Sequence, residues 1–364
     1  MNETATRANW TTTTLGPLVK LQTGKLDVNA GTENGKYPFF TCSRETYKID
    51  VAVFSGKAVI VAGNGDLNVK YFDGRFNAYQ RTYVLQVANE GLLDAQFLFH
   101  FMDVYVSTLR ANAQGSTIQY LKKAQFTDAP ISLPPLSEQK RIVDLLAAVD
   151  TYIAALQRQA ANARAARYAV LHELLTKGGD NWTEVTLGDI ATIVPGKYLP
   201  KAEYVEDGDY FVYGSNSIMG KYSKFLIEPP HTVMAAIGAY AGAVRYSPLA
   251  SWVNNNAFGL LVKPSVLPGY FYLWVNSMLD LSTVVAGTGQ PYVQRPALRA
   301  TKLVLPPIVV QHEIVETMTT LDSAIQATDQ AIRAATQLRS GLAESLLSGD
   351  HEIPETYDHF LGAA

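Results

Sequence analysis

The chain repeats itself, with a constant offset in residue number between matching motifs. Trp10-x4-Leu15-Gly16 recurs as Trp182-x4-Leu187-Gly188, and Leu133-Pro134-Pro135 recurs as Leu305-Pro306-Pro307. The same offset relates Gly24-Lys25 to Gly196-Lys197 and Gly115-x4-Tyr120 to Gly287-x4-Tyr292. Between these motifs the offset drifts slightly. We therefore interpret the chain as one unit copied twice, with different loops in each copy.

Each copy is predicted to begin with a globular domain, at residues 1–134 and 180–306. Both domains are rich in Gly, Tyr and Asn and contain short β-type runs, such as Lys57 to Ala62 and Thr82 to Val87. A helix is predicted from Asp94 to about Leu109, and its counterpart is predicted to begin at Pro268. These features are typical of mixed α/β domains.

Each copy is predicted to continue as one long helix, at residues 135–179 and 307–349, before an acidic tail at 350–364. Between Pro135 and Lys177 there is no glycine or further proline. Apolar or small residues recur at alternating steps of four and three, which is a heptad pattern. The first helix carries Ile142, Leu146, Val149, Ile153, Leu156, Ala160, Ala163, Arg167, Val170 and Leu174 at these positions. The second carries Ile314, Met318, Leu321, Ile325, Thr328, Ile332, Ala335, Arg339, Leu342 and Leu346.

The two heptad seams predict that the long helices pair with each other as an antiparallel coiled coil, since each alone would expose its seam. The predicted fold is α+β, with two mixed α/β domains joined by this coiled coil and related by a pseudo-twofold internal repeat. The alternative is that each helix packs on its own domain. Arg167 and Arg339 occupy matching seam positions. They either form a polar layer that sets the register or extend to solvent at the edge.

Composition excludes several classes of protein. Hydrophobic residues make up 48% and charged residues 17% of the chain, which excludes a disordered chain, and the net charge of −3 argues against a uniformly basic nucleic-acid coat. One cysteine, Cys42, excludes internal disulfides and multi-thiolate metal sites. The polar N-terminus has no signal-peptide core, and the apolar stretch from Thr232 to Val244 is too short to span a bilayer. We expect a soluble, cytoplasmic protein.

No catalytic, cofactor or metal site is predicted from the sequence. The six histidines form neither an HxH nor an HExxH spacing, and the chain contains no GxSxG elbow and no P-loop. The Pro-Pro pairs lack the preceding Asn or Asp and the following aromatic residue that an amino-methyltransferase site requires.

Polar and aromatic residues in the two globular domains are candidates for contacts with DNA. Amides can pair with adenine edges and arginine with guanine, although turns and caps use the same residue types. The candidates lie in glycine-containing loops at 63–66 and 238–242, in the segments 75–81, 254–256 and 287–295, after the repeated glycines 24 and 196, and at two further positions in the second domain. They are Lys25, Asn64, Arg75, Asn77, Gln80, Arg81, Lys197, Asn216, Tyr240, Arg245, Asn254, Asn255, Gln290 and Arg295.

The chain resembles the specificity subunit of type I restriction–modification systems over essentially its whole length. The motif Leu133-Pro134-Pro135-Leu136-Ser137-Glu138-Gln139 before a heptad helix carries this resemblance, together with its repeat and the Trp-x4-Leu-Gly domain starts. The second copy reads Val309-Val310-Gln311 and lacks the Glu. That departure makes the two helix starts unequal as docking surfaces.

The resemblance implies two target-recognition domains that each read one half of a split double-stranded DNA site. It implies that the chain is not itself an enzyme and holds no cofactor. Two modification subunits, which use S-adenosylmethionine to methylate adenine N6, are implied partners, and restriction subunits can join them. Two alternatives stay open: a scaffold whose paired domains bind proteins, and a stand-alone DNA-modifying enzyme with an unrecognised site.

Overall fold

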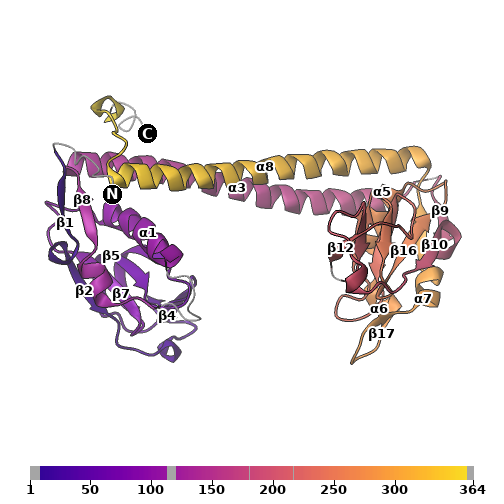
Figure 1. Ribbon diagram of the computed structural model, residues 1–364, viewed down its shortest axis with the longest axis horizontal. Coiled ribbons are helices and arrows are strands. Elements are labelled where there is room, and N and C mark those ends of the chain that lie inside the picture. The colour runs from indigo at the N-terminus through magenta and orange to yellow at the C-terminus, as the bar shows by residue number, and fades with distance from the viewer. Residues whose placement is uncertain (1–8, 113–119, 180, 216, 359–364) are drawn as a thin grey trace. The chain divides into compact units, whose positions relative to one another are not determined.

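The computed structural model describes residues 9–112, 120–179, 181–215 and 217–358, and it divides into two compact units (Figure 1). Unit 1 comprises residues 1–157 and 330–364, and unit 2 comprises residues 158–329. Helix α3 (Leu136–Thr176) begins in unit 1 and ends in unit 2, whereas α8 (Ile308–Ser348) begins in unit 2 and ends in unit 1.

Unit 1 is built on a six-stranded sheet with the order β2-β7-β5-β6-β3-β4. All neighbours are antiparallel except β3 and β6. The strands are β2 (Val19–Thr23), β3 (Tyr37–Phe40), β4 (Thr46–Ile49), β5 (Phe54–Ala62), β6 (Val69–Ala78) and β7 (Thr82–Val87). The predicted β-type runs at 57–62 and 82–87 therefore form strands, within β5 and as β7.

The predicted helix of the first domain is α1 (Ala95–Asn112), which packs on β5 and β6. Asp94 caps it, because its carboxylate accepts from the N–H groups of Gln96 and Phe97 at 2.8 and 3.0 Å. Phe97, Leu98 and Met102 are fully buried in the unit 1 core. Short elements complete the unit: β1 (Thr11–Thr14), η1 (Gly16–Leu18), η2 (Val28–Ala30), α2 (Lys123–Thr127), β8 (Pro130–Leu133) and η4 (Glu355–Tyr357).

Unit 2 repeats this plan with its sheet divided in two. A four-stranded sheet has the order β10-β16-β13-β14, which matches β2-β7-β5-β6, and a three-stranded sheet has the order β12-β11-β15. The strands are β9 (Thr183–Thr186), β10 (Ala191–Pro195), β11 (Tyr210–Tyr213), β12 (Ile218–Tyr222), β13 (His231–Ala235), β14 (Val244–Ser247), β15 (Ser251–Val253), β16 (Ala257–Val262), β17 (Val285–Ala286), β18 (Tyr292–Val293) and β19 (Lys302–Leu305).

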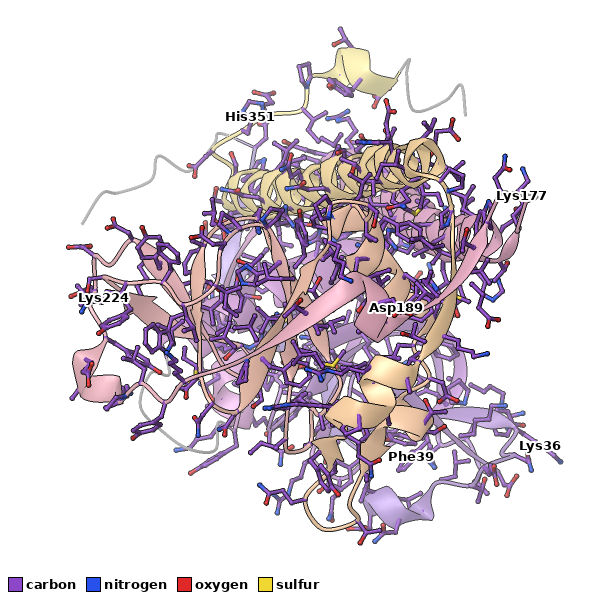
Figure 2. The ribbon with its side chains drawn as sticks, turned by 90° about the vertical axis from the view of Figure 1, so that its right-hand side faces the viewer. Lys36, Phe39, Lys177, Asp189, Lys224 and His351 are labelled. Atoms are coloured by element: carbon purple, nitrogen blue, oxygen red, sulfur yellow. The ribbon has the colours of Figure 1, made fainter. Side chains whose placement is uncertain are left out.

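The helices of unit 2 are short apart from the coiled-coil segments. They are α4 (Leu187–Ile190), η3 (Lys201–Glu203), α5 (Pro268–Met278), α6 (Leu281–Val284) and α7 (Arg295–Ala300). Helix α5 starts at Pro268 as predicted, since proline lacks only an N–H that the first turn would leave unpaired. Asp189, labelled in Figure 2, closes a capping box at the start of α4, because its carboxylate accepts from the N–H and hydroxyl of the N-cap residue Thr186 at 2.9 and 2.6 Å.

The repeat is also visible in strand register. Thr11 faces Leu133 in the β1–β8 pair, and Thr183 faces Leu305 in the β9–β19 pair. Both partners are shifted by the same offset that relates Trp10 to Trp182 in the sequence. Each domain is therefore closed by the same two-stranded ribbon immediately before its long helix.

The long helices pair antiparallel within each unit, as the heptad seams predicted. In unit 1, Ile142, Val143 and Leu146 of α3 share a core with Ala343, Leu346 and Leu347 of α8. In unit 2, Leu171 and Leu175 of α3 share a core with Ile314 and Met318 of α8. Every predicted seam residue is buried or half-buried. The same clusters include residues of the domain, so the helix ends pack both on each other and on the domain.

Candidate nucleic-acid interface

In unit 1, a glycine-containing loop and a tyrosine distant in sequence lie together at the end of the sheet. Asn64 forms a single antiparallel bridge with Tyr120, and the N–H of Leu121 donates to the carbonyl of Gly63 at 2.7 Å. Gly63 has no room for a side chain, because a Cβ there would lie 2.4 Å from the carbonyl oxygen of Arg81. The close approach of these backbones brings the loop against the β6–β7 turn.

This junction encloses a cavity of about 260 Å³. Three predicted contact residues, Asn64, Gln80 and Arg81, line it together. Gln80 and Arg81 are exposed and Asn64 is half-buried. The complete lining is Thr23, Gly63, Asn64, Gln80, Arg81, Tyr83, Tyr120 and Leu121. An arginine and two amides around one hollow are the groups that hydrogen-bond base edges.

Lys25 lines a neighbouring and larger cavity of about 890 Å³, and Thr23 lines both. The lysine is exposed. The repeated glycine before it has a packing role, because a Cβ on Gly24 would lie 1.8 Å from the carbonyl oxygen of Ala78. Gly196 has the same packing role, because a Cβ added to it would lie 2.0 Å from the carbonyl oxygen of Asn254. Lys197, which follows Gly196, is exposed. The repeated Gly-Lys pairs therefore combine a required glycine with an exposed cation.

Unit 2 joins the corresponding segments in the same way. Ile237 forms a bridge with Tyr292, and the N–H of Gly238 donates to the carbonyl of Pro291 at 2.8 Å. Gly238 has a φ of +87°, which favours glycine. The loop presents Tyr240 at 51% exposure, and Tyr240 and Arg245 line a cavity of about 230 Å³. Gln290 lies exposed between β17 and β18.

Two predicted contact residues are buried and hydrogen-bonded within their own domains. Asn77 is 2% exposed, its amide donates to the carbonyl of Val51 at 2.9 Å, and its carbonyl oxygen accepts from the N–H of Ala78. Asn254 is 5% exposed, and its side-chain oxygen accepts from the N–H of Asn255 at 2.7 Å. Asn77 also lines the larger cavity beside Lys25, and the amide N–H of Asn254 lies 3.9 Å from the sulfur of Met219. Base contacts by these two asparagines stay a prediction.

The other candidates lie apart from these cavities. The guanidinium of Arg75 lies 4.8 Å from the ring centre of Tyr37, and that of Arg295 lies 5.5 Å from the ring centre of Phe258. Arg295 lines a separate hollow with Asp189 and Arg299. Asn255 is exposed beside the buried Asn254. Asn216 lies outside the described residues.

Two buried glutamines, which sequence reasoning did not select, hold each domain to its helix. Gln139 accepts from the N–H of Asp94 at 2.8 Å and donates to the carbonyls of Leu92 and Pro134, both at 2.9 Å. Gln311 accepts from the N–H of Leu267 at 2.8 Å and donates to the carbonyls of Ser265 and Pro306 at 3.2 and 2.9 Å. Both side chains are fully buried. The signal in the sequence was that both glutamines occupy the same position of the repeat.

Glu138, the residue missing from the second copy, also has a structural partner. Its carboxylate accepts from the indole N–H of Trp10 at 3.0 Å, and Trp10 is buried in the unit 1 core. At the corresponding position in α8 the chain has Val310. The Glu therefore fastens the first residues of the domain to α3.

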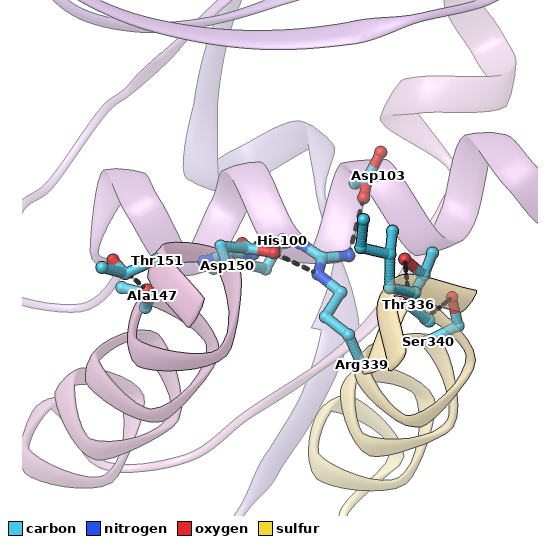
Figure 3. A network of polar contacts seen from close by, with 9 residues as sticks. His100, Asp103, Ala147, Asp150, Thr151, Thr336, Arg339 and Ser340 are labelled. Carbon is cyan, nitrogen blue, oxygen red and sulfur yellow. Dashed lines mark hydrogen bonds and ion pairs between the residues drawn. The ribbon is translucent and has the colours of Figure 1, made fainter. Parts of the chain in front are cut away.

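The seam arginines form ion pairs between the helices. Arg167 is paired with Asp322 in unit 2, with an Nη2–Oδ2 distance of 2.8 Å. In unit 1, Arg339 contacts Asp150 with an Nε–Oδ1 distance of 2.9 Å and Asp103 with an Nη1–Oδ2 distance of 3.1 Å (Figure 3). Of the two readings of these arginines, the polar layer is therefore correct.

His100 of α1 completes the unit 1 network. Its Nδ1 lies 3.3 Å from Nη2 of Arg339 (Figure 3). Since a guanidinium only donates, Nδ1 accepts and the imidazole is neutral. Burial, and secondly the charge of Arg339, lower the pKa of His100 from 6.5 to about 4. The network thus joins α1, α3 and α8 through one neutral histidine, one arginine and two aspartates.

Metal sites and membrane-spanning helices are both absent from the described ranges. No cluster of three or more His, Cys, Asp or Glu side chains there is arranged to hold a metal ion. Among the described helices, none combines the length and apolar character needed to cross a membrane.

The domain architecture has clear relatives of known type. The domain described as "Type I restriction modification DNA specificity domain" matches residues 7–163 and again residues 179–336. The EcoDI type I restriction enzyme specificity subunit of Escherichia coli is 41% identical over 167 residues, which span 45% of this chain and 37% of that subunit. The MjaVIII specificity subunit of Methanocaldococcus jannaschii is 22% identical over 94% of this chain and 92% of its own length.

Solved structures agree with the fold. The crystal structure of the type I restriction–modification S subunit from M. genitalium covers 95% of this chain and 98% of its own, with a TM-score of 0.60 and 20% identity. At this identity the likeness establishes the fold alone. The two matches of the family domain cover most of the sequence and coincide with its two copies. The chain therefore belongs to the type I restriction–modification DNA specificity family and carries the family's domain twice.

Proposed function

We propose that this chain is the DNA-recognition subunit of a type I restriction–modification complex and reads a bipartite site with its two domains. The observation that supports this most is the repeated junction of two loops, which displays exposed polar and aromatic residues in both domains. Asn64, Gln80 and Arg81 gather there in one domain. Tyr240 and Arg245 line the corresponding loop in the other.

The side chains at the loop junctions differ between the two domains, which favours recognition of two different half-sites. An arginine, a glutamine and an asparagine in the first domain favour contacts with guanine and adenine edges. The second domain has Tyr240, Arg245 and Gln290 in the corresponding region, so its pattern of donors and acceptors differs. Exposed Lys25 and Lys197 are suited to phosphate contacts, which position a domain without reading sequence.

In this proposal, two modification subunits bind S-adenosylmethionine, dock on the specificity subunit and carry out the methylation. Restriction subunits are further partners of the same assembly. The starts of the long helices offer apolar surface for docking: Leu136 is 38% exposed on α3, and Ile308 and Val309 are 40% and 64% exposed on α8. A protein-binding scaffold without DNA has no comparable support among the relatives.

Mapping of N6-methyladenine tests this proposal. DNA from cells expressing the chain with its modification subunits should carry methylated adenines in one split sequence, and the isolated chain should transfer no methyl groups. Arg81→Ala should then relax the first half-site alone, at about 1–3 kcal/mol for a lost base contact. Gln290→Ala should relax the second alone. Methylation without sequence preference, or transfer by the isolated chain, would contradict the proposal.

A further inference from the structure

Two exposed tyrosines occupy equivalent places in the domains that the proposed function assigns to different half-sites. Tyr120 and Tyr292 are separated by the repeat offset, as the Gly-x4-Tyr motifs already indicated. They are 65% and 46% exposed, although each is followed by an apolar residue, Leu121 or Val293, that is only 7% exposed. The chain is thus anchored immediately beside each ring, while the ring itself is left in solvent.

The backbone around both tyrosines is held in the same way. Tyr120 bridges to Asn64 and Tyr292 bridges to Ile237. The N–H of Leu121 donates to Gly63 at 2.7 Å, and the N–H of Val293 donates to Ala236 at 2.9 Å. Each ring is therefore displayed from a position fixed by main-chain hydrogen bonds, which lowers the entropy that a contact through it would cost.

The neighbours of the two tyrosines differ, whereas the tyrosines do not. Tyr120 lines a cavity with Asn64, Gln80 and Arg81. Tyr292 bridges to Ile237, which begins the loop that carries Tyr240. Groups that read different bases must differ between the domains. A residue that is the same in both is suited to a contact that does not depend on sequence.

We infer that Tyr120 and Tyr292 stack on a base of their respective half-sites, as a sequence-independent contact shared by both domains. The inference rests on the proposed function. Every base has an aromatic face, so stacking tolerates any sequence. A duplex exposes such a face where a side chain enters a base step or where a methyltransferase takes its target base out of the stack.

The test uses the chain in complex with its modification subunits and a labelled duplex that carries the sequence recovered by methyladenine mapping. Tyr120→Leu and Tyr292→Leu should each weaken binding roughly 10-fold, the range expected for loss of one stacked base. The order of preference among half-site variants should stay unchanged. Tyr120→Phe and Tyr292→Phe should bind nearly as well as the unmodified chain, because the ring is retained.

Tyr47→Leu is the matched control, since Tyr47 is 42% exposed on β4 and is not among the residues lining the two unit 1 cavities. Unchanged melting temperatures would show that the variants fold. Full affinity of Tyr120→Leu, an altered base preference, or a Phe variant as weak as the Leu variant would each overturn the inference while leaving the proposed function intact. Failure of the unmodified complex to bind any duplex would instead overturn the proposed function, and the inference with it.

Discussion

Arg339 donates to Asp150 across the two helices with an Nε–Oδ1 distance of 2.9 Å, and the Arg167–Asp322 pair is its repeat. Arg339 and Asp322 lie at the repeat positions of Arg167 and Asp150, with the offset that relates the two domain starts. Each helix therefore supplies the arginine of one pair and the aspartate of the other. Arg164 and Asp329 form a further ion pair, with an Nη2–Oδ1 distance of 2.6 Å. The equivalent positions in the other helix hold Thr336 and Gln157, which cannot form an ion pair. This contact therefore forms only between α3 and α8, and not between two copies of either helix.

A fragment of residues 1–179 should form a symmetric dimer. In that dimer, Arg167 of one copy meets Asp150 of the other, because Asp150 takes the place of Asp322. Asp150→Arg should break the dimer through like charges, and adding Arg167→Asp should restore it. Sedimentation equilibrium measures the mass of each form. A well-folded monomer of the unmodified fragment would show that helix pairing does not drive association.

The 1–179 fragment should also prefer a mixed pair with the fragment 180–364 over its own dimer by a few-fold. Only the mixed pair forms the Arg164–Asp329 contact, which is worth about 0.2–1 kcal/mol for an exposed ion pair. Arg164→Gln should reduce this preference by a few-fold in a native mass measurement. If the preference for the mixed pair is the same with and without Arg164→Gln, the apolar seam and not this ion pair determines which fragments associate.

Gln139→Leu should destabilise unit 1 by about 2–4 kcal/mol, since it removes three hydrogen bonds and leaves buried main-chain groups without partners. Gln311→Leu should do the same in unit 2. Urea denaturation measures both. Gln157→Leu, on the exposed face of α3, is the control and should change stability by less than about 0.5 kcal/mol. Equal effects of Gln139→Leu and Gln157→Leu would contradict the role of the buried amide.

Acidification should destabilise unit 1 through His100. Its folded pKa of about 4 lies below the unfolded value of 6.5, so the unfolded chain binds more protons between these values. The resulting stability is present above pH 6.5 and is lost as the pH falls toward 4. Between pH 7.5 and pH 5 the loss should be about 2 kcal/mol. His100→Gln should flatten this dependence in urea titrations, and the exposed His172→Gln should not.

Lengthening both helices should lengthen the spacer between the half-sites. Seven residues inserted near Ala160 and seven near Ile332 preserve the heptad phase and add about 10 Å at about 1.5 Å per residue. Duplex DNA rises about 3.4 Å per base pair, so the spacer should grow by about three base pairs. Methylation mapping over a library of spacers measures this. An unchanged spacer with unchanged half-sites would show that helix length does not set the distance.

The helices, their seams and several strands could be predicted because period and composition are local properties of the sequence. The partners of Arg167 and Arg339 could not, since they depend on the register between helices that are far apart in the chain. The burial of Asn77 and Asn254 could not be predicted either, for a related reason. Their residue type suits base contacts, but their burial is decided by strands that the local sequence does not reveal.

The glutamine contacts of the two helix starts involve only main-chain atoms of the domain: one N–H and two carbonyls in each copy. Such a joint makes no demand on the side chains of the domain that it holds. The exposed residues of the loop junctions can therefore change without disturbing these bonds, provided that the apolar face that the domain packs against the helices is kept. The attachment of each domain to its helix through these glutamines is thus independent of the side chains that the proposed function assigns to DNA contacts.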